Sequence, residues 1–194
     1  MTDITPNSLR NRQAILAISV LFLVILSICV AVVLTKTLVL IKPNQRGMVI
    51  SAIEPGGFRP GILNPGYHLL IPGVERAVVF DIGRQTYTIN GSDSLQAKTA
   101  DGQIIQVDLA ITYAVDPEQV LNLYRTWNMN YEVGLVRPVG RGASRDILTQ
   151  YTFVKTLQKR PEIAQAIADK LAPTFAENYL ILLQVELLDI RRAP

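Results

Sequence analysis

Residues 14–35 have the sequence AILAISVLFLVILSICVAVVLT, which contains no charged residue and is overwhelmingly aliphatic. As a helix with a rise of about 1.5 Å per residue, this segment would be roughly 33 Å long, enough to cross a hydrocarbon core of about 30 Å. A cleaved signal peptide would have a shorter apolar region and a small-residue cleavage site, and neither is found. We therefore predict a transmembrane helix over residues 14–35, preceded by a polar tail over residues 1–13.

The charges that flank this predicted span do not fix its orientation. Arg10 and Arg12 precede it, and Lys36, Lys42 and Arg46 follow it. The positive-inside rule requires a clear excess of basic residues on one side, and two against three is not an excess. The sequence leaves open which side of the membrane the rest of the chain occupies.

The overall composition excludes several classes of function. The formal net charge of +3 is too small to indicate a nucleic-acid-binding surface. The chain has 1 cysteine and 1 histidine, which excludes an intrachain disulfide framework and a cysteine-cluster zinc site. We find no nucleophilic triad, no glycine-rich nucleotide fingerprint and no paired acid–base groups. We therefore expect no enzyme activity, no cofactor and no nucleic-acid partner.

Strand patterns dominate the chain up to residue 115. Short apolar runs over residues 47–53, 76–83 and 84–89 are typical of strands. Asp101-Gly102 favours a type I′ hairpin turn, in which both central residues take a positive φ. Beyond this turn, apolar residues alternate with mostly polar ones, which predicts a long strand with one buried face. The residues of that face are Ile105, Val107, Leu109, Ile111, Tyr113 and Val115.

Helical patterns begin at Asp116, where the period of two ends. Asp116 is a suitable helix N-cap, and Pro117 occupies the first helical position that follows it. A second helix is predicted over residues 131–149. A short helix over residues 153–159 is predicted to start at a Thr152 cap.

A last helix and a last strand complete the predicted fold. Pro161 opens a helix with apolar residues at every fourth position, and Pro173 is expected to bend or break it. The run YLILLQVELLDI returns to strand character. The order of these elements predicts an α+β fold in two parts. The first is a small antiparallel β subdomain over residues 42–115, and the second contains helices and the closing strand over residues 116–192.

The stretch EPGGFRPGILNPGYHLLIPG, residues 54–73, repeats the dipeptide Pro-Gly at a spacing of five. A flexible linker would be polar and rich in glycine and serine, whereas this stretch carries several apolar residues that need burial. A phosphate-binding loop needs free backbone N–H groups before a helix, and prolines remove them. Proline followed by glycine is typical of type II turns. We therefore interpret the stretch as tight turns that join very short strands.

These motifs together resemble a known family. The ordered set IKPNQRGMVIS, PGYHLLIPG, AKTADGQIIQVDLAITYAV, VRPVGRGASRDIL and VELLDI is similar to the SPFH domain, also called Band 7. This domain occurs in stomatins, prohibitins, flotillins and the bacterial HflK and HflC proteins. The resemblance covers nearly all of residues 42–192, with the apolar segment in front of it, and is that of a membrane-anchored bacterial-type member.

The resemblance implies a function in membrane organisation. Members of this family are membrane-bound scaffolds that assemble into large rings or cages and often sequester membrane proteases. We expect a single-pass protein of a bacterial cell membrane, with the lipid bilayer and copies of itself or related SPFH subunits as partners. The alternative is a regulatory partner that modulates a membrane AAA protease. Family members normally continue into a long coiled coil, so the chain is expected to be a fragment. The NYLIL sequence before the last strand also departs from the small residue that the family tends to carry there.

Two groups of residues are candidates for contacts. Arg137, Arg141 and Arg145 are spaced at four and would form a basic stripe on a helix, suited to lipid headgroups or a neighbouring subunit; the simpler alternative is a solvated helix face. The second group lies in the Pro-Gly stretch, which a short connection holds close to the membrane. Partial insertion of one of its turns into the bilayer interface is the functional hypothesis, and burial in the small β core is the alternative. The candidates for insertion are Phe58, Ile62 and Leu63.

Overall fold

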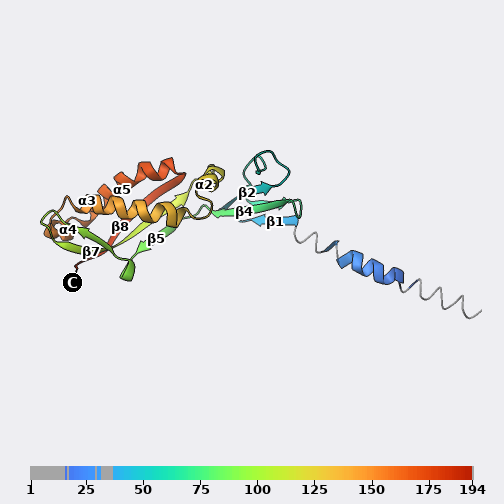
Figure 1. Cartoon of the computed structure of the whole chain (residues 1–194), viewed down its shortest axis with the longest axis horizontal. Coiled ribbons are helices and arrows are strands. Elements are labelled where there is room, and N and C mark those ends of the chain that lie inside the picture. Colours follow the sequence, from blue (N-terminus) through green and yellow to red (C-terminus); the bar gives the residue numbers. More distant parts are fainter. Residues whose placement is uncertain (1–15, 17, 29, 32–36, 194) are drawn as a thin grey trace, which may run out of the picture.

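The structure is a computed structural model, and it describes all residues except 1–15, 17, 29, 32–36 and 194. The folded part of the chain is an elongated body with two units that follow each other along its long axis (Figure 1). Strands β1–β4 form the unit next to the N-terminal helix, and strands β5–β8 with the remaining helices form the other. The predicted combination of helices with antiparallel sheets is confirmed.

The β1–β4 unit consists of two small antiparallel pairs. Strand β1 (Leu38–Ile41) pairs with β3 (Gly66–Leu69), and β2 (Gln45–Ser51) pairs with β4 (Glu75–Asp81). Their inward-facing side chains form a core of their own. Its buried members are Ile41, Val49, Leu63 and Leu70.

The Pro-Gly stretch is ordered, as predicted, and its glycines take the conformation that the turns require. Gly56 has a φ of 92° and Gly61 a φ of 93°, values that disfavour any residue with a side chain. After each of these turns a single β-bridge ties the stretch to β2, from Phe58 to Ile50 and from Leu63 to Gly47. The stretch therefore forms a folded edge of the β1–β4 unit and is not a linker.

The second unit contains a sheet in which β7 (Ile104–Val115) is the central strand. On one side β7 pairs with β5 (Gln85–Ile89) and β6 (Leu95–Lys98), and on the other it pairs over its whole length with β8 (Leu180–Arg192). A short 3-10 turn, η1 (Gly91–Asp93), joins β5 to β6. The buried face of β7 is the one predicted from its alternation. The predicted boundary between the two subdomains falls between residues 115 and 116, so β7 lies before it and β8 after it. These two strands pair, and the sheet therefore contains residues from both predicted subdomains.

The β6–β7 hairpin is confirmed, but its predicted turn type is wrong. Of Asp101 and Gly102, only Gly102 has a positive φ, 80°. The Gly102 N–H donates to the Thr99 carbonyl, and the Thr99 N–H donates to the Gln103 carbonyl at 2.9 Å. This is a three-residue loop with glycine in the left-handed position, which is the alternative to the two-residue type I′ turn.

Four helices and one π-helical turn accompany this sheet, and the two longest of the helices lie over one face of it (Figure 1). Along the chain they are α2 (Val120–Trp127), the π-helical turn η2 (Glu132–Val136), α3 (Arg137–Leu148), α4 (Phe153–Gln158) and α5 (Arg160–Glu177). The predicted cap of α4 is confirmed, because the Thr152 hydroxyl accepts a hydrogen bond from the Lys155 N–H.

One predicted helix boundary is wrong, and one of the two expected effects of Pro173 is excluded. Helix α2 begins at Val120 and not at Pro117, because residues 117–119 form a turn in which the Asp116 carboxylate accepts from the Glu118 N–H at 2.9 Å. The prediction for Pro173 was a bend or a break; helix α5 is not broken there and continues to Glu177, so a bend is the effect that stays a prediction. The late start of α2 reflects a competing Asx turn, in which the aspartate side chain accepts a hydrogen bond from a backbone N–H two residues later, so that no helix is needed there.

A chain of aromatic rings joins the two units. Phe58 packs edge-on against Tyr124 of α2 at 6.1 Å between ring centroids, and Phe80 of β4 packs against the same ring at 6.3 Å. Tyr131 lies 6.4 Å from Phe80 and 6.4 Å from Tyr113, which in turn lies 6.1 Å from Phe175. Met48 and Phe80 are buried in the same cluster as the β5–β8 core. The two units therefore share packed side chains and do not meet through a linker.

The predicted span over residues 14–35 lies partly outside the described residues. Its described part is helical at residues 16, 18–28 and 30–31, and its side chains are exposed. No helix in the described part of the chain combines the length and apolar character that a bilayer crossing requires.

Candidate functional site

Exposed apolar side chains gather at the end of the β1–β4 unit that faces the N-terminal helix. Leu38 pairs with Leu69, and Leu40 pairs with Tyr67, so these four side chains lie on one face of the β1–β3 pair. Leu69 is 70% exposed and Tyr67 is 71% exposed. The other face of the same pair is turned inward, with Ile41 and Leu70 in the core.

The path of the chain explains why further apolar residues join this face. Strand β2 ends opposite the start of β4, where Ser51 pairs with Glu75, and the Leu70 N–H donates to the Thr37 carbonyl, just before β1, at 2.7 Å. The turn after β2 carries exposed Ile53, and the turn before β4 carries exposed Ile71. The Ala52 N–H donates to the Val74 carbonyl at 3.1 Å, which holds the two turns together. We call the resulting set the apolar end surface; its members are Leu38, Leu40, Ile53, Tyr67, Leu69 and Ile71.

An ion pair and a backbone bond fix the turn that carries part of this surface. The Glu75 carboxylate is 3% exposed, accepts from the Ile71 N–H at 2.9 Å and pairs with Arg59 Nη1 at 3.1 Å. Arg59 also donates to the Leu69 carbonyl at 3.4 Å. A buried carboxylate with these partners is costly to disturb, so the turn is held in one conformation. Leu69 and Ile71 are thereby presented to the outside.

The three residues predicted to insert into the bilayer pack inside the protein to different degrees. Leu63 is buried in the core of the β1–β4 unit, and Ile62 is partly buried against the larger core. Phe58 stacks on Tyr124, and the Arg125 guanidinium lies 5.1 Å from the centre of its ring. These contacts favour the alternative of core burial. The exposed apolar residues of this unit are on the neighbouring face.

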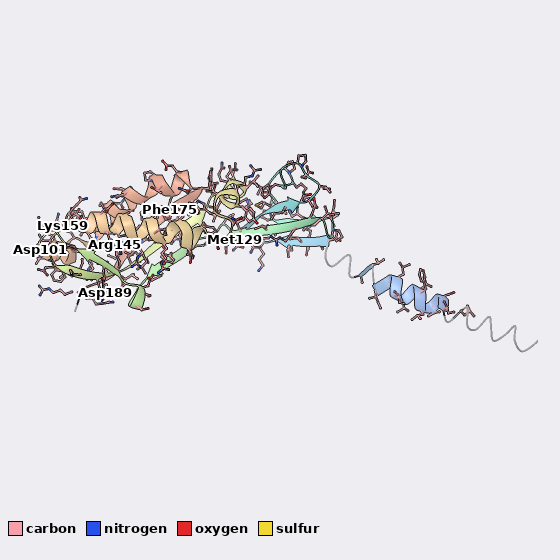
Figure 2. All side chains as sticks on the ribbon, in the orientation of Figure 1. Asp101, Met129, Arg145, Lys159, Phe175 and Asp189 are labelled. Carbon is pink, nitrogen blue, oxygen red and sulfur yellow. The ribbon has the colours of Figure 1, made fainter. Side chains whose placement is uncertain are left out.

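The three arginines predicted to form a basic stripe lie on α3, and each contacts the segment before or within β6. Arg137 Nη2 lies 2.6 Å from Asp93 Oδ1, and Arg141 Nη1 lies 3.3 Å from the same oxygen. Arg145 donates to the Gln96 carbonyl at 3.1 Å; Figure 2 shows Arg145 on α3 beside the sheet. The arrangement attaches α3 to the β6 edge of the sheet. Their contact with lipid or with another subunit stays a prediction.

Within the described ranges, no group of three or more histidine, cysteine or acidic side chains is placed to hold a metal ion. Burial raises the pKa of the Tyr113 hydroxyl, and the nearby Glu132 carboxylate raises it further. That hydroxyl donates to Glu132 at 3.1 Å within the aromatic chain that joins the units. The hydrogen bond between Tyr113 and Glu132 gives the buried Tyr113 hydroxyl a partner.

The part of the apolar end surface that lies on β1, Leu38 and Leu40, was missed from the sequence, although a signal was present. The sequence TLVLIK, directly after the predicted span, alternates with Leu38 and Leu40 on one side and Val39 and Ile41 on the other. That period of two predicts a strand with one buried face. The second side is also apolar, and this departure from the usual polar outer face is the sign of a contact surface.

Comparisons with known proteins agree on one family. The family model described as "SPFH domain / Band 7 family" matches residues 39–194. Similar curated proteins include Prohibitin-1 of Colletotrichum higginsianum, 22% identical over 80% of this chain and 54% of the relative. They also include Prohibitin-6, mitochondrial, of Arabidopsis thaliana, 22% identical over 77% of this chain and 50% of the relative. The Mitochondrial prohibitin complex protein 1 of Caenorhabditis elegans is 23% identical over 72% of this chain and 48% of the relative.

The chain thus spans about half the length of these curated relatives. The three organisms are a fungus, a plant and a nematode, and two of the three names refer to mitochondria. These relatives give no support to the predicted bacterial membrane.

Proposed function

The chain belongs to the SPFH domain / Band 7 family, and from this premise we propose that it is a membrane-attached scaffold whose β1–β4 unit lies against the bilayer. The family predicted from the sequence motifs is thereby confirmed. Residues 14–35 would anchor the chain in the membrane as a single helix. The apolar end surface would then lie in the interface between headgroups and acyl chains.

One observation carries this proposal: the exposed apolar residues of the β1–β4 unit are on the face nearest to the apolar N-terminal segment. Leu38 follows the end of the predicted span by three residues, and each residue extends at most about 3.5 Å. This distance keeps the apolar end surface within reach of the headgroup region. Tyr67 on this face is 71% exposed and is a residue type that favours the membrane interface.

Site-specific fluorescence tests the position of this surface. A solvent-sensitive fluorophore is attached to Leu69→Cys, and in a second protein to Ile62→Cys, each in a Cys29→Ala full-length chain. The proteins are reconstituted into phosphatidylcholine vesicles that contain lipid-linked quenchers. We expect strong quenching at position 69 and weak quenching at position 62. A fully aqueous signal at position 69 would contradict the proposal that this face contacts lipid.

The scaffold role requires several copies, and the regulatory alternative requires a protease. One relative is named as a protein of a prohibitin complex, which supports assembly of related subunits as the working proposal. A mild-detergent extract of the full-length protein is sized, and its components are identified by mass spectrometry. A large assembly of identical or related SPFH subunits favours the scaffold. A small complex of defined stoichiometry with a membrane protease favours the regulator.

A further inference from the structure

A groove between α5 and β8 forms a second surface with exposed apolar residues, in the unit that lies away from the N-terminal helix. Its volume is about 680 Å³. On the side of α5 it is lined by small residues that recur every four positions, so a neighbouring backbone can approach closely. On the side of β8 it is lined by leucines. The residues that the argument uses are Ala164, Ala168, Ala172, Leu183 and Leu188.

Both leucines occupy irregularities of the β-ladder. The register between β7 and β8 skips Leu183 and Leu188, which have no partner on β7. They are 45% and 46% exposed. A bulge redirects its side chain and interrupts the regular spacing of backbone groups. The outer edge of β8 pairs with no strand in the described part of the chain, and its two bulges make it a poor template for an added strand. The groove therefore suits a helix with apolar side chains.

Helix α4 presents such side chains on the same chain. Val154 and Leu157 are three positions apart, so they lie on one face of the helix, and they are 58% and 40% exposed. The helix is held firmly, because Thr152 caps it and the Asp101 carboxylate accepts from the Phe153 N–H at 3.2 Å. We call Val154 and Leu157 the α4 ridge; Lys155 follows Val154 by one position, about 100° round the helix, and flanks the ridge. The ridge lies at the end of the molecule opposite the N-terminal helix (Figures 1 and 2), where Asp101 and Lys159 are labelled.

The charges of the groove and of the residue that flanks the α4 ridge are complementary. Asp169 and Glu186 line the groove, and neither carboxylate forms an ion pair with another described residue. Asp169 accepts from Gln165 at 2.8 Å, and Glu186 accepts from Gln184 at 2.6 Å. Arg160 is the positive charge of the groove, at the end next to α4. Lys155, which flanks the ridge on α4, is exposed and forms no ion pair among the described residues.

We infer that the α5–β8 groove binds the α4 ridge of a second copy of this chain. Val154 and Leu157 would fill the space between the alanines of α5 and the two bulge leucines, and Lys155 would face Asp169 or Glu186. The ridge and the groove are different surfaces, so each copy offers both and the contact can be repeated from copy to copy. This inference rests on the proposed scaffold function and names the surfaces through which copies would meet.

Complementary variants test the contact. The full-length chain is prepared with two different fluorophores on terminal tags, and association is measured by energy transfer in phosphatidylcholine vesicles. A ridge variant, Val154→Asp/Leu157→Asp, and a groove variant, Leu183→Asp/Leu188→Asp, should each associate with themselves at least tenfold more weakly than the original protein. A mixture of the two should regain association, because one variant retains an intact groove and the other an intact ridge.

Reversal of the charges on both surfaces tests the contact in a second way, which does not depend on apolar packing. Lys155→Glu should weaken association, and its combination with Asp169→Lys in the same chain should restore it. Val133→Asp is the matched control: Val133 is 66% exposed but lies in neither surface, so this variant should associate like the original protein. Thermal unfolding of each variant shows whether it is folded, and Leu183→Ala/Leu188→Ala replaces the groove variant if it is not.

Three results would overturn the inference. The first is association of the ridge and groove variants at the original strength, and the second is a mixture that associates no better than either variant alone. The third is a monomeric original protein in the vesicles. These results are separable from a failure of the proposed function, because the quenching of a fluorophore at position 69 reports bilayer contact in a monomer as well as in an assembly.

Discussion

Replacement of Phe58 by alanine distinguishes membrane insertion of this side chain from packing within the protein. Phe58 is partly exposed, stacks edge-on against Tyr124 and lies under Arg125. Truncation of a fully buried phenylalanine costs about 3–5 kcal/mol. The edge-to-face pair contributes about 0.5–1.5 kcal/mol of such a loss, and the cation–π contact about 0.5–1 kcal/mol. For a partly exposed ring, we expect Phe58→Ala to lower the free energy of unfolding by about 2–3 kcal/mol.

Thermal unfolding followed by far-UV circular dichroism measures this effect on the full-length chain in non-ionic detergent. For a protein of this size, each kcal/mol corresponds to about 2–4 °C, so Tm should fall by about 4–12 °C. The matched control is Leu69→Ala, whose side chain is exposed. It should change the free energy of unfolding by less than about 0.5 kcal/mol. It should instead reduce contact with the bilayer, because removal of buried CH₂ groups costs about 0.8 kcal/mol each.

The two variants should therefore affect different measurements. Phe58→Ala should lower Tm and leave the quenching of a fluorophore at position 71 in vesicles unchanged. Leu69→Ala should leave Tm unchanged and weaken that quenching. A Tm for Phe58→Ala within about 2 °C of the original protein, together with weaker quenching, would refute the assignment of Phe58 to the protein interior. Unchanged quenching for Leu69→Ala, together with a lower Tm, would refute the assignment of Leu69 to the bilayer.

Two further predictions concern the β5–β8 unit. Gly140→Ala should lower the free energy of unfolding by up to about 2 kcal/mol in chemical denaturation, because its Cβ would collide with the buried side chain of Ile111. Gly142→Ala, on the same helix with open space around it, should raise that free energy by about 0.5–1 kcal/mol. The Thr99 hydroxyl lowers the pKa of the Asp101 carboxyl below its usual 3.8, with a smaller contribution from the Phe153 N–H. The ionised Asp101 carboxylate therefore stabilises the folded state above pH 3.8, and this stabilisation is lost as the pH falls through the folded-state pKa. In acid, Tm of the original protein should fall more steeply than Tm of Asp101→Asn.

The sequence predicted the elements of this fold better than their partners. The alternation from Ile105 to Val115 identified the central strand and its buried face, because side-chain direction in a strand is a local property. The cap at Thr152 was also predictable, since a capping residue bonds to the backbone three positions away. The turn at Asp101-Gly102 was placed correctly but given the wrong type, because both hairpin loops use a left-handed glycine.

The residues of the candidate sites depend on long-range pairing, and a single sequence does not reveal it. Phe58 and Tyr124 are far apart in the chain, and their contact depends on how α2 packs beside β2. In the same way, Leu40 and Tyr67 become one surface only when β1 pairs with β3. The bulges at Leu183 and Leu188 depend on the register of β8 against β7. Each of these sites is formed by contacts that local propensity does not encode.

The two proposed surfaces support each other through the geometry of the chain. The apolar end surface lies at one end of an elongated body, and the α4 ridge lies at the other (Figure 1). The aromatic contacts from Phe58 through Tyr113 to Phe175 join the two units. Attachment at one end would therefore also orient the groove and the α4 ridge relative to the bilayer. Copies held on one surface in one orientation meet at a high effective concentration, so a contact between them can be weak in solution and still sustain an assembly on the membrane. Loss of the apolar end surface should for this reason weaken association between copies even where groove and ridge are intact, whereas loss of the groove should leave bilayer contact unchanged.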